Sequence, residues 1–491
     1  MTELTSPTRR RYLPVILTAS GGTFLAMLDS TVTNLAVPNL QHAFPAAAVS
    51  TLSWVISAYA VMFAALLAPA GRLADVLGRR RLFVLGVSLF TLSSLLCALA
   101  PSLIMLIVAR ALQGAGGACM IPASLAILLL DGPADKRSHS IGIWSATSAF
   151  AAAVGPTIGG LLVEEFSWRS VFVINLPFGV LLVISALRLL AKPTGDRSQI
   201  PDPVGIVLAT IGVGGLTLGV TEGGTWGWTS AAVLASLVVG VLAIALAIVR
   251  SRGQQVPAIE SSLWSNRTFT MTNVVSLLYG LAQYSWMLAC VLFLTNIWGY
   301  SELLTGLAMA PGAVVGSLAA LAAGRIGPKL RGGPRFATLF GLTSFLACAL
   351  WFTFGLPAHP AFVAVWLPGG TLIGLGMGAA TTGTSGFAAQ SAPPTKFATS
   401  SGLNTTARQF GGALGVAVLA TIVALTPNHG SLGAYASYHN IFVFCSIAVV
   451  LALAISAIWL HLTPVKPAAP EPAGSSDRRS GAVDSVAASD A

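Results

Sequence analysis

Long apolar runs separated by short polar segments fill most of this 491-residue chain. A helix needs about 20 mainly apolar residues to cross the hydrocarbon layer of a bilayer. Fourteen runs meet that requirement, near residues 13–38, 50–70, 82–100, 102–130, 140–163, 170–190, 203–221, 231–250, 268–295, 303–324, 336–355, 361–388, 399–425 and 440–462. The pattern therefore predicts an all-α integral membrane protein with fourteen transmembrane helices.

The basic residues test this count independently, because the cytoplasmic loops of membrane proteins are enriched in lysine and arginine. With the N-terminus inside, all but three of the 26 basic residues fall on the cytoplasmic side. Arg169 lies on the outer side, and Arg110 and Arg408 lie within predicted helices. One missing or additional span would scramble this alternation, so we expect both termini in the cytoplasm.

The spans divide into two sets of six with an additional pair between them. The predicted units are a cytoplasmic lead (1–12), an N-terminal half (13–190), two additional helices (203–250), a C-terminal half (268–462) and a disordered cytoplasmic tail (463–491). The lead and the first apolar run could form a signal peptide. Asp29 within that run, and the thirteen spans after it, favour a retained helix instead.

Composition narrows the function further. Charged residues make up 9% of the chain, against about 25% in soluble proteins, which excludes an ordinary soluble enzyme. The net charge of +10 could indicate a nucleic-acid partner, but the bias of basic residues towards the cytoplasmic side accounts for it. The five cysteines lie singly in apolar runs, and no lysine is followed by Ser or Thr as in a phosphate-binding loop. We therefore expect no metal, no cofactor and no ATP-driven step.

A short sequence near the second span recurs near the tenth. GRLAD at residues 71–75 and GRIG at 324–327 both follow an even-numbered span and are expected in cytoplasmic loops. Such a repeat fits two parallel halves with a substrate cavity between them. The alternative is that Gly and Arg simply recur at helix ends.

Four segments, one of which extends GRLAD, resemble motifs of the major facilitator superfamily, and within it of the fourteen-helix drug/proton antiporters. They are LDSTVTNLAVP at 28–38, GRLADVLGRR at 71–80, RALQGAG at 110–116, and GPTIGG at 155–160. Ala151 stands where the last motif usually begins with glycine, and Trp168-Arg169 also fits this branch. The resemblance runs from about residue 13 to 462.

The resemblance implies a bacterial plasma-membrane transporter that works by alternating access. It would export hydrophobic or amphipathic molecules, monocationic drugs among them, in exchange for protons. We expect it to act as a monomer, with small molecules, protons and the bilayer as its partners. Alternatives are proton-coupled export of an endogenous metabolite such as an antibiotic or siderophore and, more distantly, a membrane-embedded enzyme or a channel.

Asp29 is the one acidic residue expected deep in the membrane, where a charge is costly and usually functional. Desolvation favours its protonated form, so the carboxyl could take up and release a proton. Arg110 needs a partner at that depth, and we expect it to pair with Asp29 in one conformation and to release it in another. The alternative is a permanent packing pair. Asp29 and Arg110 are therefore the predicted proton-coupling residues.

Two glycine-containing motifs have predicted mechanical roles. Asp75 could cap a neighbouring helix in one conformation only, and the predicted latch comprises Gly71, Asp75, Gly78, Arg79 and Arg80. A solvated loop charge is the alternative for Asp75. In the antiporter motif, Gly155, Pro156, Gly159 and Gly160 would permit close helix approach and a bend.

Aromatic and polar residues at mid-depth are candidates for the wall of a substrate cavity. They are Trp54, Tyr59, Gln113, Tyr279, Gln283, Tyr284, Trp286, Asn404 and Arg408. Trp and Tyr near helix ends could instead be anchors at the membrane interface. Arg408 could couple protons, bind substrate, or extend its charge to the membrane surface.

Overall fold

The computed structural model describes residues 7–45, 47, 49–191, 201–254, 256–330, 332–425 and 430–460. Within these residues, fourteen helices are long and apolar enough to cross a membrane, which confirms the predicted all-helical membrane fold. The long helices are α1 (Pro7–Ala43), α3 (Trp54–Leu77), α4 (Arg79–Ala98), α5 (Leu103–Leu130), α6 (Arg137–Glu165), α8 (Asn175–Leu189), α9 (Pro203–Trp226), α10 (Ala231–Ser251), α12 (Arg267–Asn296), α13 (Glu302–Ile326), α14 (Pro334–Gly355), α15 (Leu367–Gln390), α16 (Phe397–Leu425) and α17 (Gly430–Trp459). Short helices lie in the connections: α2 (Val49–Leu52), α7 (Ser170–Val173) and α11 (Ser261–Trp264).

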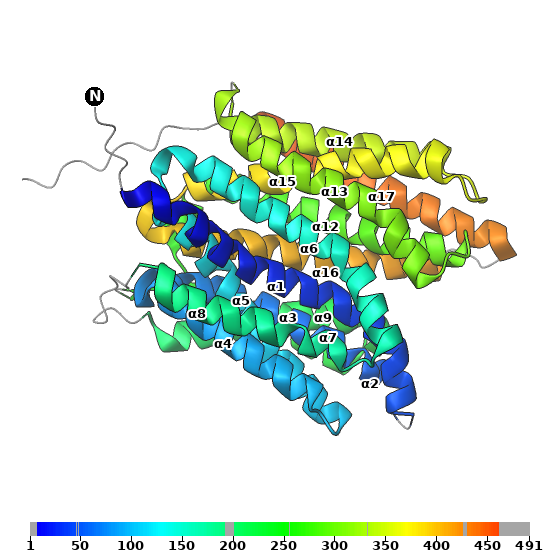
Figure 1. The fold of residues 1–491 in the computed structure, drawn as a ribbon, viewed down its shortest axis with the longest axis horizontal. Coiled ribbons are helices and arrows are strands. Elements are labelled where there is room, and N and C mark those ends of the chain that lie inside the picture. Colours follow the sequence, from blue (N-terminus) through cyan, green and yellow to red (C-terminus); the bar gives the residue numbers. More distant parts are fainter. Residues whose placement is uncertain are drawn as a thin grey trace, which may run out of the picture.

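Successive long helices run in opposite directions, so their connections collect at two ends of the bundle (Figure 1). At one end, which is at the left in Figure 1, helices α3, α10 and α13 finish and α4 and α16 begin. These helix ends carry Arg72, Arg79, Arg250, Arg325 and Lys396. We call this the basic end and the other the opposite end. The predicted loop at 192–200 and the predicted tail at 463–491 lie outside the described residues.

The long helices form two halves, α1–α8 and α12–α17. In Figure 1, most of the first half lies in the lower part of the bundle and most of the second half lies in the upper part. The halves meet along two seams. In one, α6 packs against α13, and in the other, α3 packs against α16. Buried apolar side chains also cross between the halves, because Phe397 and Ala398 of α16 belong to the same core cluster as Phe63 and Leu67 of α3.

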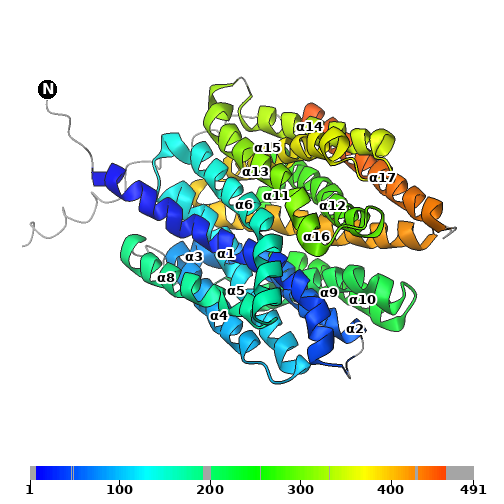
Figure 2. The same cartoon turned by 45° about the vertical axis from the view of Figure 1, so that its right-hand side comes forward.

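The two additional helices, α9 and α10, pack closely against one another. A Cβ atom on Gly240 would lie 2.8 Å from the backbone nitrogen of Leu216, so only a residue without a side chain allows this approach. Helix α9 also contacts α3 and α16, one from each half. Figure 2 shows the pair beside these helices, at the lower right of the bundle. The additional pair therefore covers the α3–α16 seam.

Three helix boundaries differ from those expected. Residues 71–75, predicted to lie in a loop, belong to α3, which continues to Leu77. No Gly or Pro follows Gly71 before Gly78, and Gly78 makes a one-residue link to α4 with a φ of +99° that favours glycine. The repeat at residues 324–326 lies in the last turn of α13. Helix α1 begins at Pro7, so part of the predicted lead is helical too.

At the basic end, backbones from the two halves are in direct contact. A Cβ on Gly142 of α6 would lie 2.8 Å from the Cα of Gly324 in α13. A Cβ on Gly71 of α3 would lie 2.4 Å from the carbonyl oxygen of Ala398 in α16. Both seams are therefore closed at this end, and the glycines let them close.

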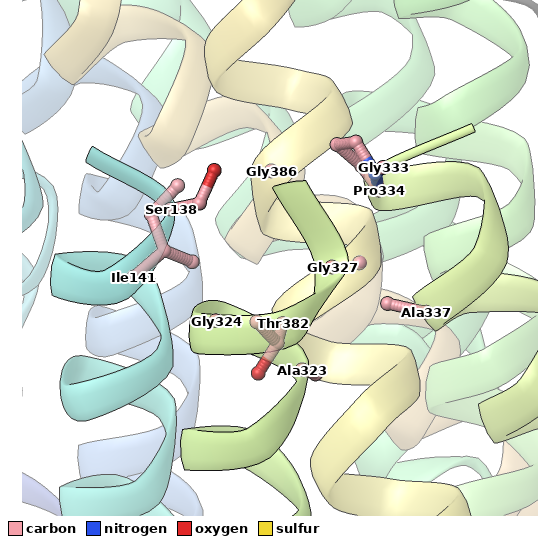
Figure 3. Close-up of a pocket in the computed structure, with 11 residues that line it drawn as sticks. Ser138, Ile141, Ala323, Gly324, Gly327, Gly333, Pro334, Ala337, Thr382 and Gly386 are labelled. Atoms are coloured by element: carbon pink, nitrogen blue, oxygen red, sulfur yellow. The ribbon is translucent and has the colours of Figure 1, made fainter. Parts of the chain in front are cut away.

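A small cavity lies beside the α6–α13 contact (Figure 3). Ser138 and Ile141 come from α6, and Gly324, Pro334 and Thr382 line the side formed by the C-terminal half. Its volume is about 20 Å³, which is room for about one water molecule. A drug-sized site needs several hundred Å³, so this cavity is a packing gap in the closed seam.

Substitution of Gly142 by Ala should weaken closure of the basic end, because the added methyl group meets backbone atoms of α13. Overpacking of this kind costs about 1–3 kcal/mol. In purified protein in lipid nanodiscs, we expect a cysteine introduced at Ser138 (Ser138→Cys) to react with a polar maleimide about fivefold faster or more in the Gly142→Ala background.

The matched control is Gly224→Ala, because no atom lies within 4 Å of a Cβ at Gly224. Equal alkylation rates in the Gly142→Ala and Gly224→Ala backgrounds would show that the Gly142 contact does not hold the end closed.

Candidate proton-coupling site and inter-half contacts

Asp29 lies in α1 with its side chain fully buried, and three side chains donate hydrogen bonds to its carboxylate. Arg110 Nη1 lies 2.6 Å from Oδ2, while Gln113 Nε2 and Asn175 Nδ2 lie 2.9 and 2.7 Å from Oδ1. These donors come from α5 and α8. All three donors are therefore side chains of the N-terminal half.

Arg110 is also fully buried, and it has further contacts besides its ion pair with Asp29. Its Nε donates to the carbonyl oxygen of Val55 at 3.0 Å, and its Nη1 donates to Gln113 Oε1 at 2.7 Å. The guanidinium lies 4.3 Å from the ring centre of Tyr59, a cation–π contact. The charge therefore has a counter-ion, two hydrogen-bond acceptors and an aromatic face.

Ser94 of α4 completes this cluster. Its hydroxyl accepts hydrogen bonds from Gln113 Nε2 at 2.6 Å and from Asn175 Nδ2 at 3.3 Å. Neither Ser94 nor Asn175 was predicted from the sequence to belong to the site. The available signal was the occurrence of buried polar residues in apolar runs, but the sequence does not show which of them converge.

The cluster lies between the middle of the bundle and its opposite end. Arg110 is seven residues from the start of α5 at Leu103, which is about 10 Å along a helix. Arg110 and Asp29 have side-chain exposures of only 1% and 0%, so solvent does not reach the carboxylate in this conformation. Proton exchange at Asp29 therefore requires the helices around it to move.

The antiporter motif in α6 packs directly on the Asp29 segment of α1. A Cβ on Gly155 would lie 1.9 Å from the hydroxyl oxygen of Thr31, two residues after Asp29. Gly159 is buried, whereas no atom lies within 4 Å of a Cβ at Gly160. The side chain of Pro156 lies outside the described residues. Close packing thus rests mainly on Gly155, and it makes the position of α1 dependent on α6.

Asp75 forms a contact between the halves at the basic end. Its carboxylate accepts hydrogen bonds from the backbone nitrogens of Ala398 and Thr399, at 3.1 and 2.7 Å, and from the Thr399 hydroxyl at 2.6 Å. These groups form the start of α16, where unpaired N–H groups and the helix dipole favour an anion. The expected capping geometry is present, but it starts from the last turn of α3 rather than from a loop.

The other polar residues of the predicted latch act within the N-terminal half. Arg79 Nε donates to Asp131 at 3.1 Å, and this ion pair links the start of α4 to the end of α5. Arg80 donates to the carbonyl oxygen of Leu187 at the end of α8. Asp75 and Gly71 therefore cross between the halves, whereas Arg79 and Arg80 organise the half from which Asp75 projects.

A second polar contact between the halves centres on Glu260, in the connection between α10 and α12. Arg72 of α3 lies 3.3 Å from one carboxylate oxygen, and Lys396, just before α16, lies 3.1 Å from the other. The Ser262 hydroxyl donates to the same carboxylate at 2.8 Å. We call Arg72, Glu260 and Lys396 the Glu260 clamp. Glu260 was not predicted from the sequence to belong to a site, because its partners lie far away in the chain.

Comparison with known proteins identifies the architecture. The Major Facilitator Superfamily model matches residues 19–416. The chain is 33% identical to the multidrug resistance protein Stp of Mycobacterium tuberculosis over 84% of this chain and 76% of Stp. It is 35% identical to the cephamycin export protein CmcT of Amycolatopsis lactamdurans, over 91% of this chain and 90% of CmcT.

The chain belongs to the major facilitator superfamily. A crystal structure of the human organic anion transporter MFSD10 has the same fold, with a TM-score of 0.61 and 17% identity over 91% of this chain and all of that one. The Asp29 cluster, the Asp75 cap and the Glu260 clamp are therefore features of a major facilitator transporter.

The predicted cavity residues of this transporter fall into four groups. Tyr59 and Gln113 belong to the Asp29 cluster. Trp54 pairs with Trp226 of α9, with ring centres 5.8 Å apart. Trp286 is buried in the core of the C-terminal half, where it stacks on Phe352.

The remaining cavity candidates lie together on α12 and α16: Tyr279, Gln283, Tyr284, Asn404 and Arg408. Asn404 donates to Ser276 at 2.8 Å, and Tyr284 donates to Gln409. Tyr59 of the N-terminal half lies within electrostatic range of Tyr284, so the two halves approach one another at this level.

The Glu260→Gln substitution should destabilise the closed transporter by about 1–2 kcal/mol, since it removes the carboxylate from two partly buried ion pairs. Burial raises the pKa of Glu260, but bonds from Ser262 and Lys396 and the charges of Lys396 and Arg72 outweigh burial, so the pKa is lower than usual. The stabilisation is therefore complete above about pH 4.3, the ordinary value for Glu, and is lost as the pH falls through the lowered pKa.

Thermal unfolding of purified protein would measure this effect. We expect the midpoint gap between wild type and Glu260→Gln to be constant from pH 8 to pH 6 and to shrink below about pH 4. Glu165→Gln, at an exposed position, is the control. A gap that changes between pH 8 and pH 6 would contradict the assigned protonation state.

Proposed function

We propose that this protein exports hydrophobic or amphipathic small molecules in exchange for protons by alternating access. The observation that carries the proposal is the sealed Asp29–Arg110 pair, a titratable carboxyl held in a membrane bundle by hydrogen-bond donors alone. Relatives with similar sequences along most of the chain are named for multidrug resistance and for cephamycin export. A transporter requires no catalytic group, and we expect the proton gradient to supply the energy without a cofactor.

In the proposed cycle, the proton and the conformational change are linked through Asp29. A proton on the carboxyl cancels its charge and its attraction to Arg110. The conformation in which Asp29 and Arg110 are paired is then no longer favoured over other conformations. Deprotonation restores that preference and draws α1 and α5 together again. Gly155 would transmit the movement, because it fixes α6 to the segment of α1 that follows Asp29.

The contacts at the basic end would be the gate of the same cycle. The protein is a multi-pass protein of the bacterial inner membrane, and we propose that its basic end faces the cytoplasm, as the distribution of basic residues suggests. The Asp75 cap and the Glu260 clamp join the halves at that end and must separate for substrate to enter from the cytoplasm. We also propose that the functional unit is a monomer.

A second candidate is export of a metabolite that the cell itself makes. CmcT is named as a cephamycin export protein, and its sequence aligns with 91% of this chain at 35% identity. Drug export and metabolite export use the same proton-coupled cycle and differ only in the substrate.

Everted membrane vesicles with an imposed pH gradient test the proposal directly. Acidification of the vesicle interior should drive uptake of compounds from a panel of dyes and drugs. Asp29→Asn should reduce this uptake to the background, about a hundredfold or more, since the amide cannot exchange a proton and a general acid–base group contributes at least that factor in other proton transfers. Uptake would be followed by dye quenching, with protein amounts matched by immunoblot.

Glu164→Gln is the matched control, because Glu164 is an exposed carboxylate at the opposite end of α6. It should retain gradient-driven uptake. Wild-type uptake that persists after collapse of the gradient would point to a channel, and normal gradient-driven uptake by Asp29→Asn would remove Asp29 from the proposed role.

A further inference from the structure

Two arginines lie inside the bundle, and they differ in how their charge is compensated. Arg110 has Asp29 as its counter-ion and further hydrogen-bond acceptors. Arg408, in α16, forms no ion pair within the described residues, and its Nη1 atom is buried without a hydrogen-bond partner. Since arginine does not lose its proton under ordinary conditions, this charge stays in place.

The position of Arg408 prevents it from reaching the membrane surface. It lies eleven residues from the start of α16 at Phe397, about 17 Å along the helix and near its middle. Half the hydrocarbon layer is about 15 Å thick, and an arginine side chain spans less than half of that depth. The backbone is also fixed, because a Cβ on Gly280 of α12 would lie 2.1 Å from the carbonyl oxygen of Arg408.

The groups around Arg408 are neutral. Tyr279 and Tyr284 of α12 lie one residue before and four residues after Gly280, the residue that contacts the Arg408 backbone. Both hydroxyls are already engaged, Tyr279 with Thr381 and Tyr284 with Gln409. Gln283, in the same stretch of α12, has a buried side-chain oxygen without a partner.

The charged groups of the helices that contact α16 lie at other depths. Asp75 lies at the basic end, and Asp29 is already bonded by three donors. Glu222 of α9 is nineteen residues from the start of that helix, about 28 Å from the basic end. Glu222 therefore lies about 11 Å further along the bundle than Arg408, and its buried Oε2 has no hydrogen-bond partner. No carboxylate of the described residues forms an ion pair with Arg408.

We propose that Arg408 receives the anionic group of the transported molecule, so that the preferred substrates are amphipathic anions that carry a carboxylate or a sulfonate. The planar guanidinium matches such a group with two parallel hydrogen bonds, and the tyrosine rings supply apolar contact area. A cationic molecule would meet Arg408 with no free carboxylate nearby. This inference rests on the proposed export function, and it replaces the monocationic substrates expected from the sequence.

Three dansyl probes that differ in charge test the inference: dansylglycine (anionic), its methyl ester (neutral) and dansyl-ethylenediamine (cationic). Binding to the full-length protein in lipid nanodiscs would be measured from dansyl fluorescence, at one pH and without a gradient. We expect the wild type to bind dansylglycine about tenfold more tightly than the other two, a difference of ~1.4 kcal/mol.

Arg408→Gln should lose this preference, with about tenfold weaker binding of dansylglycine and little change for the ester. Arg408→Lys should retain part of the preference, because lysine keeps the charge but lacks the planar fork. The matched control is Arg325→Gln, which removes an exposed charge at the basic end and should bind all three probes as the wild type does.

Equal wild-type affinity for the three probes would overturn the inference, and so would equal weakening of all three in Arg408→Gln, since that pattern indicates a structural role. If Arg408→Gln does not fold, the relative affinities of the wild type and of Arg408→Lys for the three probes still test the inference. The same probes in vesicles separate the two proposals. Arg408-dependent binding without gradient-driven uptake would refute only export, whereas gradient-driven uptake without anion preference would refute only this inference.

Discussion

A charge within a hydrocarbon layer is stable only when other groups of the protein replace its hydration. This constraint decides where the charged residues of the transporter lie. Asp29 and Arg110 are tolerated because each is the other's main partner, and Gln113, Asn175 and Ser94 occupy the hydrogen-bonding positions that remain. With Tyr59 of α3, five helices contribute to this cluster, so a change at the carboxyl affects most of the N-terminal half.

The contacts at the basic end follow a different logic. There the two halves are joined by backbone contact at glycine and by a few charges that reach across the seams. Phe397, at the start of α16, adds a large apolar side chain that is buried in the core cluster of the N-terminal half, so separation of the halves would also expose this side chain. Asp75 and Glu260 both bond groups at or just before the start of α16, which makes that helix the common target of both contacts.

Much of this arrangement could be predicted from the sequence. The thickness of the hydrocarbon layer sets the length of each hydrophobic run, and the bias of basic residues towards the cytoplasmic side sets the distribution of arginines. The fourteen helices were predicted on that basis, and the pairing of Asp29 with Arg110 was expected because each needs a partner at depth. The contributions of Ser94 and Glu260 could not be predicted, since they depend on which helices become neighbours. Trp286 illustrates the same difficulty. Its depth suggested a cavity wall, but the side of α12 that it occupies faces Phe352 in the core.

The additional helix pair makes the two seams unequal. Because α9 packs on both α3 and α16, a molecule dissolved in the lipid meets a helical cover on that side of the transporter. At the α6–α13 seam, the helix that contacts both partners is α15, which belongs to the C-terminal half itself. The additional pair therefore adds a helical layer from outside the two halves to the α3–α16 seam. For the export function proposed above, we expect compounds dissolved in the bilayer to exchange with the transporter at the α6–α13 seam rather than beneath α9 and α10.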